Sequence, residues 1–210
     1  MHDHALPAIT PSHTSRSLAR YWPVRVALAL LLILGAACGD SDDASDDAGG
    51  GPGSGDGSSE GEPAALRGIT QLHNETRALV GVAPLDWDTE LAKVAQAWAE
   101  KCQDNEAPSG LIDHNSGRSD DYPGYVGENI YGSSGMATPA GALQSWTAEA
   151  ASYDYDSNTC SGTCGHYTQV VWAASVRLGC GLASCPGLRF GNAIVCDYSP
   201  GGNIGSQRPY

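Results

Sequence analysis

The chain has 210 residues, 41% of them hydrophobic, and a formal net charge of −13, which fits one domain with a buried core and appended segments. Only 11 residues are Lys or Arg, against 24 Asp or Glu. Because sequence-independent nucleic-acid binding depends on positive charge that neutralises phosphates, we expect no nucleic-acid partner.

The first 37 residues have the pattern of an export signal. Arg16, Arg20 and Arg25 precede the uncharged apolar run 26–37, which has the length of a signal-peptide core and is too short to span a bilayer as a helix. Small residues then precede Cys38, as in a bacterial lipobox, in which the cysteine becomes the lipidated first residue. We therefore expect a cell-surface lipoprotein anchored in a membrane through Cys38 or, with plain cleavage, an extracellular protein.

Residues 38–63 form a second segment of different composition. Aspartates alternate with glycine and serine, and no apolar residue larger than alanine or proline occurs in 39–63. Such a segment cannot bury enough surface to offset the entropy lost on ordering, so we predict a disordered acidic tether. The folded domain is then predicted over 64–210.

The first half of this domain predicts amphipathic helices. Apolar residues recur at spacings of three and four over 66–79, over 89–102 and over 139–150. Asp88 is the predicted N-cap of the second helix, and Thr138, followed by a proline, is that of the third.

The second half predicts strands. The segments 167–173, 176–182 and 188–198 are rich in β-branched and aromatic residues and are separated by glycines. Helices followed by strands indicate an α+β domain in which helices pack on an antiparallel sheet.

The cysteines predict disulfides. Without Cys38 six remain: Cys102, Cys160, Cys164, Cys180, Cys185 and Cys196. An even number in an exported chain indicates three disulfides, whose pairing the spacing leaves open. A zinc site is the alternative, because four of the cysteines form two closely spaced pairs, but no C-x2-C pair occurs and the expected compartment is oxidising.

Six short motifs occur in order along 64–210. They are HNETR at 73–77, LDWD at 85–88, GENI at 127–130, YDY at 153–155, GHYTQVVW at 165–172 and CDYSPGGN at 196–203. Together they resemble the CAP superfamily of cysteine-rich secretory, antigen 5 and pathogenesis-related-1 proteins, most closely its plant pathogenesis-related-1 branch. The resemblance implies a three-layer α-β-α sandwich with a central antiparallel sheet. It also implies the disulfides Cys102–Cys185, Cys160–Cys164 and Cys180–Cys196.

The resemblance also implies a cleft formed by two histidines and two glutamates, which match His114, Glu128, Glu149 and His166. The two histidines would bind a divalent metal such as Zn²⁺, since imidazole nitrogens are common zinc ligands. Glu128 and Glu149 would orient the imidazoles, act as further ligands or, as candidate catalytic residues, act as a base. The alternative is a buried hydrogen-bonded network that only fixes loops on the sheet.

Three functions remain open at this point. The resemblance favours an exported, monomeric binding or interaction module with a lipid or sterol ligand, without catalytic activity. A metal-dependent, protease-like hydrolase that uses the same cleft is the alternative. The third possibility is a structural surface domain displayed by its tether.

Overall fold

The computed structural model describes residues 60–107 and 109–210, so the predicted export signal, Cys38 and most of the predicted tether lie outside the described residues. The folded domain includes residues before the predicted boundary at 64. Glu62, which its composition assigned to the tether, is buried, and its carboxylate accepts hydrogen bonds from the backbone N–H groups of Gly68 (2.6 Å) and Thr70 (2.8 Å). These bonds cap the N-terminus of α1 (Ile69–Leu79), where a negative charge is favourable.

One four-stranded sheet forms the centre of the domain. Its strand order is β1 (Asp86–Trp87), β5 (Arg177–Ser184), β6 (Asn192–Ser199), β2 (Gly127–Ser133). β5, β6 and β2 pair antiparallel, whereas the two-residue β1 pairs parallel with β5. The central sheet is therefore antiparallel, as expected, except at its short β1 edge. A second, two-stranded sheet pairs β3 (Tyr153–Asp154) with β4 (Thr159–Cys160).

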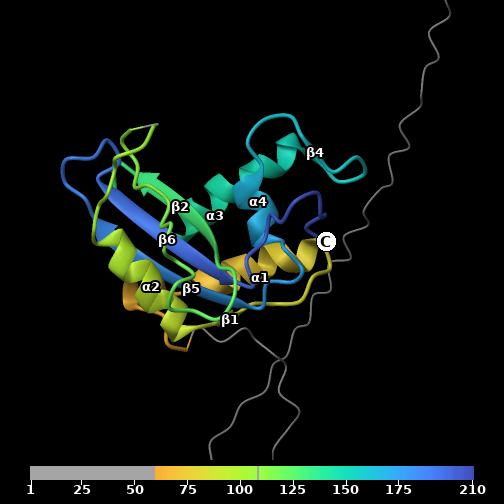
Figure 1. Cartoon of the computed structure of the whole chain (residues 1–210), viewed down its shortest axis with the longest axis horizontal. Helices are drawn as coiled ribbons and strands as arrows, with labels where there is room; N and C mark the ends of the chain where they lie inside the picture. The colour runs from red at the N-terminus through yellow and green to blue at the C-terminus, as the bar shows by residue number, and fades with distance from the viewer. Residues whose placement is uncertain (1–59, 108) are drawn as a thin grey trace, which may run out of the picture. The chain divides into compact units, whose positions relative to one another are not determined.

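Helices cover both faces of the four-stranded sheet (Figure 1). α2 (Thr89–Ala99) packs on one face, against Val195 and its neighbours, whereas α1, α3 (Pro139–Ala148) and α4 (Gly165–Val170) pack on the other, against Ile194 and Tyr198. Successive residues of β6 thus contribute alternately to two cores, as the two-residue period of a strand requires. The layers form the predicted α-β-α sandwich. Two short 3₁₀ helices, η1 (Ala64–Leu66) and η2 (Glu149–Ser152), precede α1 and follow α3.

The N-termini of α2 and α3 lie where the sequence predicts them. Asp88 accepts hydrogen bonds from the N–H groups of Glu90 (2.9 Å) and Leu91 (3.0 Å), and Thr138 accepts one from Gly141 (3.1 Å). Both caps satisfy N–H groups that have no partner within the helix. Local sequence is sufficient to specify these two helix starts.

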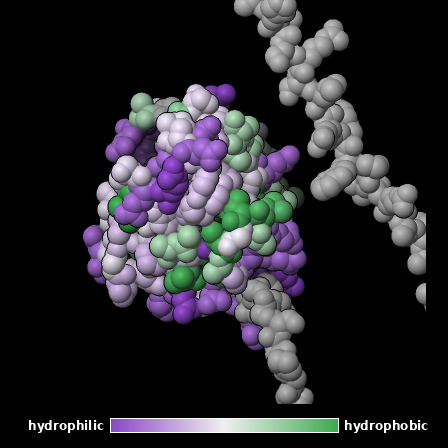
Figure 2. Space-filling model, turned by 90° about the vertical axis from the view of Figure 1, so that its right-hand side faces the viewer, coloured by the Kyte–Doolittle hydropathy of each residue, from purple (hydrophilic) through white to green (hydrophobic). Residues whose placement is uncertain are grey.

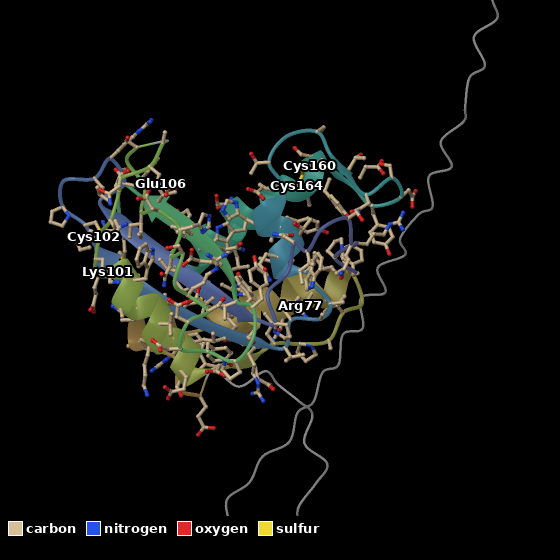
Figure 3. The ribbon with its side chains drawn as sticks, viewed as in Figure 1. Arg77, Lys101, Cys102, Glu106, Cys160 and Cys164 are labelled. Atoms are coloured by element: carbon tan, nitrogen blue, oxygen red, sulfur yellow. A yellow bond between two sulfur atoms is a disulfide. The ribbon has the colours of Figure 1, made fainter. Side chains whose placement is uncertain are left out.

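The predicted strand at 167–173 is wrong, because Gly165–Val170 form the helix α4. Glu149 accepts hydrogen bonds from the backbone N–H groups of His166 (2.9 Å) and Tyr167 (3.2 Å) in the first turn of α4. The Cys160–Cys164 disulfide closes a short loop immediately before that turn (Figure 3). These contacts outweigh the β propensity of the run. The sheet instead contains β2, which was not predicted.

α2 lies directly against β5, because β5 carries glycines at the points of contact. A Cβ atom at Gly179 or Gly181 would collide with the backbone of α2 at Ala92 or Gln96, respectively. The Gln96 amide uses this proximity: it donates to the Leu182 carbonyl (3.0 Å) and accepts from the Leu182 N–H (2.9 Å). Both bonds lie on β5 beyond the two residues that β1 pairs with.

Three disulfides connect Cys102 with Cys185, Cys160 with Cys164 and Cys180 with Cys196, which are the pairs that the family resemblance implies. The last joins β5 and β6 at directly opposite positions. Disulfides of this number fit an oxidising, extracytoplasmic compartment. No helix within residues 60–107 and 109–210 combines the length and hydrophobicity that a bilayer crossing requires.

Arg77 on α1 is a fully buried cation. Its guanidinium donates four hydrogen bonds of 2.7–2.9 Å to backbone carbonyl oxygens, those of Ala83, Val170, Trp172 and Ser175. Burial lowers the pKa of Arg77 to about 10, which leaves it charged at neutral pH. Arg77, labelled in Figure 3, therefore fixes α1 to the segment that follows α4.

His73, also on α1, is fully buried at one end of a hydrogen-bonded chain. Its Nδ1 lies 2.7 Å from the Ile69 carbonyl oxygen and therefore carries the proton, so Nε2 accepts from the Tyr198 hydroxyl (2.8 Å). Asn129 donates to that hydroxyl (3.1 Å) and to the His166 carbonyl (3.0 Å). Burial lowers the pKa of His73 to about 4, so the ring is neutral at pH 7. This chain of hydrogen bonds connects α1, through side chains of β6 and β2, to the backbone of α4.

Candidate functional site

His114 and His166 line one hollow of about 210 Å³. His114 comes from the loop between α2 and β2, and His166 comes from the first turn of α4. Ile130 of β2 and residues 106, 107 and 111–113 complete the lining; Glu106 is labelled in Figure 3. The fold therefore brings together two histidines that are 52 positions apart in the chain.

His114 is oriented by Glu128. The two side chains are joined by a 2.6 Å contact between Nδ1 and Oε1, and the N–H of Asn115 donates to the same carboxylate oxygen (2.9 Å). The Glu128 side chain is fully buried, whereas 58% of the His114 side chain is exposed. The buried carboxylate thus fixes the imidazole through Nδ1, and the rest of the ring stays accessible to solvent.

His166 is oriented in the same way by Glu149. Its Nδ1 lies 2.6 Å from Oε1 of Glu149, and the second carboxylate oxygen accepts from two backbone N–H groups of α4. The ring also stacks on Trp146 at a centroid distance of 6.4 Å and an interplanar angle of 15°. The position of Glu149 immediately after α3 therefore fixes both α4 and the imidazole that α4 presents.

Both imidazoles have the same pattern of free and bound nitrogens. Each directs Nδ1 to a carboxylate, and within the described ranges neither Nε2 atom makes a hydrogen bond. Histidines that bind metals through one nitrogen commonly donate the other N–H to a carboxylate, which fixes the tautomer and raises the basicity of the ligand. The histidines thus fit metal ligands, with the glutamates as their orienting partners.

The described residues that line the hollow include two imidazoles, those of His114 and His166, and two carboxylates, those of Glu106 and Asp113. No group of three or more His, Cys, Asp or Glu side chains among residues 60–107 and 109–210 is arranged to hold a metal ion. A zinc ion bound here would therefore need water or a second molecule to complete a tetrahedral set of ligands. The residues fit an open, two-ligand site and do not fit a closed structural one.

Neither glutamate is free to act as a base. Both oxygens of Glu149 accept hydrogen bonds, from the His166 ring and from the backbone of α4. Oε1 of Glu128 accepts two hydrogen bonds, and its Oε2 is buried without a partner. A general base must reach the proton that it removes, and in this structure both glutamates are occupied by the imidazoles that they orient.

Asp197 is a further residue of this site that sequence reasoning missed. It lies on β6 directly opposite Glu128 of β2, and it is completely buried. Burial and the nearby Glu128 carboxylate raise the pKa of Asp197 well above its usual range. The register of β2 and β6 is the signal that identifies it, and β2 itself was not predicted.

A second hollow, of about 480 Å³, lies alongside α2. Its lining is mostly apolar and includes Pro63, Trp87, Ala92 and Ala97, while Lys93 and Glu100 add charge. Pockets of this size and character are typical of small-molecule sites. Figure 2 also shows a hydrophobic area among hydrophilic residues on one face of the molecule. Because apolar surface is common on soluble proteins, we assign no site to that area.

Known proteins match both the sequence and the fold. The model of the cysteine-rich secretory protein (CAP) family matches residues 70–198. Pathogenesis-related protein 1 of Arabidopsis thaliana is 42% identical over 140 residues, which cover 67% of this chain and 79% of that protein. GLIPR1-like protein 1 of Mus musculus is 38% identical over 156 residues, which cover 71% of this chain and 65% of that protein.

Two solved structures share this fold. Venom allergen-like protein 4 of Schistosoma mansoni has a TM-score of 0.54 at 29% identity, with 70% of this chain and 94% of that chain covered. A structure of NaASP2 with Zn²⁺ has a TM-score of 0.54 at 24% identity, with 70% and 84% covered; at this identity the likeness concerns the fold. The chain therefore belongs to the cysteine-rich secretory protein (CAP) family and is similar to its pathogenesis-related-1 members.

Proposed function

We propose that this chain is an exported binding module whose His114–His166 hollow holds one divalent cation, for which Zn²⁺ is the best candidate. The observation that supports this is the shared geometry of the two histidines, each held at Nδ1 by a glutamate and each with Nε2 free of hydrogen bonds within the described ranges. A bound Zn²⁺ would supply Lewis-acid chemistry with coordination positions left open. Glu128 and Glu149 would orient the rings.

Zinc titration of the metal-free full chain by calorimetry tests this proposal. We expect one Zn²⁺ per hollow, loss of that binding in both His114→Ala and His166→Ala, and affinity reduced by about 10- to 100-fold in Glu149→Gln, because an orienting partner is lost. Glu75→Gln is the matched control, since it removes the same charge from an exposed position on α1. Zinc binding that survives unchanged in both histidine variants would belong to other histidines, such as His2 or His4, and would refute the proposal.

A metal-dependent hydrolase using the same cleft is the competing function. It requires a carboxylate free to take a proton, whereas the hydrogen bonds of Glu149 and the burial of Glu128 leave neither glutamate of the predicted cleft free for this role. We therefore expect no hydrolysis of a fluorogenic peptide library in the presence of Zn²⁺. Zinc-dependent hydrolysis that is lost in His166→Ala and retained in Glu75→Gln would establish the enzyme instead.

A second ligand, of the fatty-acid or sterol class, is supported by the apolar hollow alongside α2. Trp87 lines that hollow, so a bound apolar molecule would change its fluorescence. We expect saturable binding of palmitate or cholesterol that is abolished by Ala97→Trp, which fills the hollow, and retained in the exposed control Glu75→Gln. Binding that Ala97→Trp leaves unchanged would exclude this hollow.

Anchoring to a membrane remains part of the proposal. Residues 39–59, outside the described part, separate Cys38 from the folded domain. Mass spectrometry of protein from the membrane fraction tests the anchor: diacylglycerol on Cys38 is the expected result, and an unmodified N-terminus confined to the medium would show a released protein.

A further inference from the structure

Asp197 and Glu128 form a buried pair of carboxyl groups. They lie directly opposite each other in the antiparallel register of β6 and β2, where Cβ atoms on the same face are about 5 Å apart. Both side chains are fully buried. Within the described residues, neither oxygen of Asp197 has a hydrogen-bond partner, and Oε2 of Glu128 also lacks one. Three carboxyl oxygens are therefore left unsatisfied in the same part of the core.

Two carboxylates cannot both be charged in such a place without a large cost, because the low dielectric of the core strengthens their repulsion. The charged groups that act on Asp197 are Glu128 of β2 and Arg118 of the preceding loop; its partner on β5 is Gly179, which has no side chain. Arg118 is already held by the carbonyl oxygens of Val126 (2.7 Å) and Asn115 (2.7 Å). Positive charge at this position is therefore insufficient to neutralise two carboxylates.

The hydrogen bonds distinguish the two carboxyl groups. Oε1 of Glu128 accepts from the His114 ring and from the Asn115 N–H. Within the described residues, Asp197 accepts no hydrogen bond at either oxygen, so nothing there stabilises its ionised form. If Asp197 is protonated, its O–H has an acceptor opposite it in Oε2 of Glu128, and the orphaned oxygen of Glu128 gains a donor.

We propose that Asp197 is a neutral carboxylic acid whose O–H donates to Oε2 of Glu128, and that it is thereby a positioning residue for His114. Asp197 holds the Glu128 side chain turned toward the imidazole, so that the proton of His114 stays on Nδ1 and Nε2 faces the hollow. Any effect of Asp197 on ligand affinity rests on the proposed function. The protonation of Asp197 does not rest on it, because that state can be measured in metal-free protein.

Carbon-13 NMR of the side-chain carboxyl groups, recorded across pH on the metal-free full chain, tests the protonation state directly. We expect the Asp197 signal to keep the shift of an acid at about pH 6, where ordinary Asp and Glu are ionised. Asp88 is an internal control, because hydrogen bonds from Leu91 and Tyr122 lower its pKa. In Glu128→Gln the neighbouring charge is replaced by an amide donor, so the Asp197 signal should titrate at lower pH than in the wild type.

Two substitutions of Asp197 separate positioning from packing. Asp197→Asn keeps a donor opposite Glu128, and we expect the nitrogen-15 signature of His114 with the proton on Nδ1 to be retained. Asp197→Leu keeps the branched shape of the side chain but lacks the donor, and we expect a measurable shift of that signature toward the other tautomer. An Asp197 signal that is ionised at about pH 6 in wild type, or that moves when Mg²⁺ or Ca²⁺ is added, would overturn the proposal. If Asp197→Leu does not fold, the wild-type and Glu128→Gln titrations still decide it.

Discussion

Acidification should destabilise this domain through His73. The ring is fully buried, and both nitrogens are used: Nδ1–H donates to a carbonyl oxygen and Nε2 accepts from the Tyr198 hydroxyl. A second proton would require Nε2 to become a donor opposite a hydroxyl that already donates to it, inside an apolar core. The neutral ring is therefore the form that the folded state accepts.

The magnitude follows from the pKa. Burial lowers the pKa of His73 from 6.5 to about 4, so in the folded state it binds fewer protons than the unfolded chain over this range. Stability from His73 is fully present above pH 6.5 and is lost as the pH falls toward 4. A shift of this size corresponds to about 3 kcal/mol of unfolding free energy.

Urea unfolding of the wild type and of His73→Gln, measured at intervals between about pH 4 and pH 7, tests this reasoning. Gln cannot titrate, so the wild type should lose about 3 kcal/mol more than the variant over the range. Glu75→Gln, on the same helix but exposed, should follow the wild-type curve. A difference between wild type and His73→Gln that stays constant with pH would refute the argument, because contributions from Asp197 and the other carboxyl groups are common to both proteins.

Three further predictions concern stability and are measured by the urea midpoint at neutral pH. Arg77→Met leaves four backbone carbonyl oxygens, three of them in buried hydrogen bonds, without their donor and should cost more than about 3 kcal/mol; a cost below about 1 kcal/mol would show that water replaces the guanidinium. Gly181→Ala places a methyl group against the backbone of α2 and should cost about 1–3 kcal/mol or more, whereas Gly135→Ala, whose Cβ would meet nothing closer than the Ser133 hydroxyl at 3.9 Å, should cost less. Replacing both Cys180 and Cys196 by Ala opens a loop with a sequence separation of 16 and should cost about 3 kcal/mol; unchanged stability would show that the strand pairing alone holds β5 to β6.

Local sequence was sufficient where the structure depends on neighbouring residues. Asp88 and Thr138 cap the helices that they were predicted to cap, because each bonds N–H groups two or three residues ahead. The β-branched and aromatic residues of 188–198 likewise predict a strand, and β6 occupies most of that segment.

The prediction failed where contacts distant in the sequence decide the outcome. The β-branched run after Gly165 forms a helix because Glu149, outside that run, binds its first N–H groups. Glu62 belongs to the domain for the same kind of reason, since it caps a helix that begins seven positions later.

The site shows the same division. The family resemblance identified the two histidines and two glutamates as candidate residues of a cleft. Their role as metal ligands and orienting groups stays a prediction. The residue spacing could not give which ring nitrogen meets which carboxylate, because that depends on how the loop at His114 and the helix at His166 approach the edge of β2. The position of Asp197 opposite Glu128 follows from the register of β6 and β2. Because β2 was not predicted, that register could not be predicted either.

The two hydrogen bonds between Gln96 and Leu182 have a consequence for how the domain behaves among its own copies. β5 is paired by β1 over only two residues, and a bare edge beyond that point would offer a template onto which another chain could add a strand. The side-chain amide substitutes for one peptide group of such a neighbour and occupies the donor and acceptor at this position. We therefore expect this single glutamine on α2 to disfavour intermolecular extension of the sheet at this position.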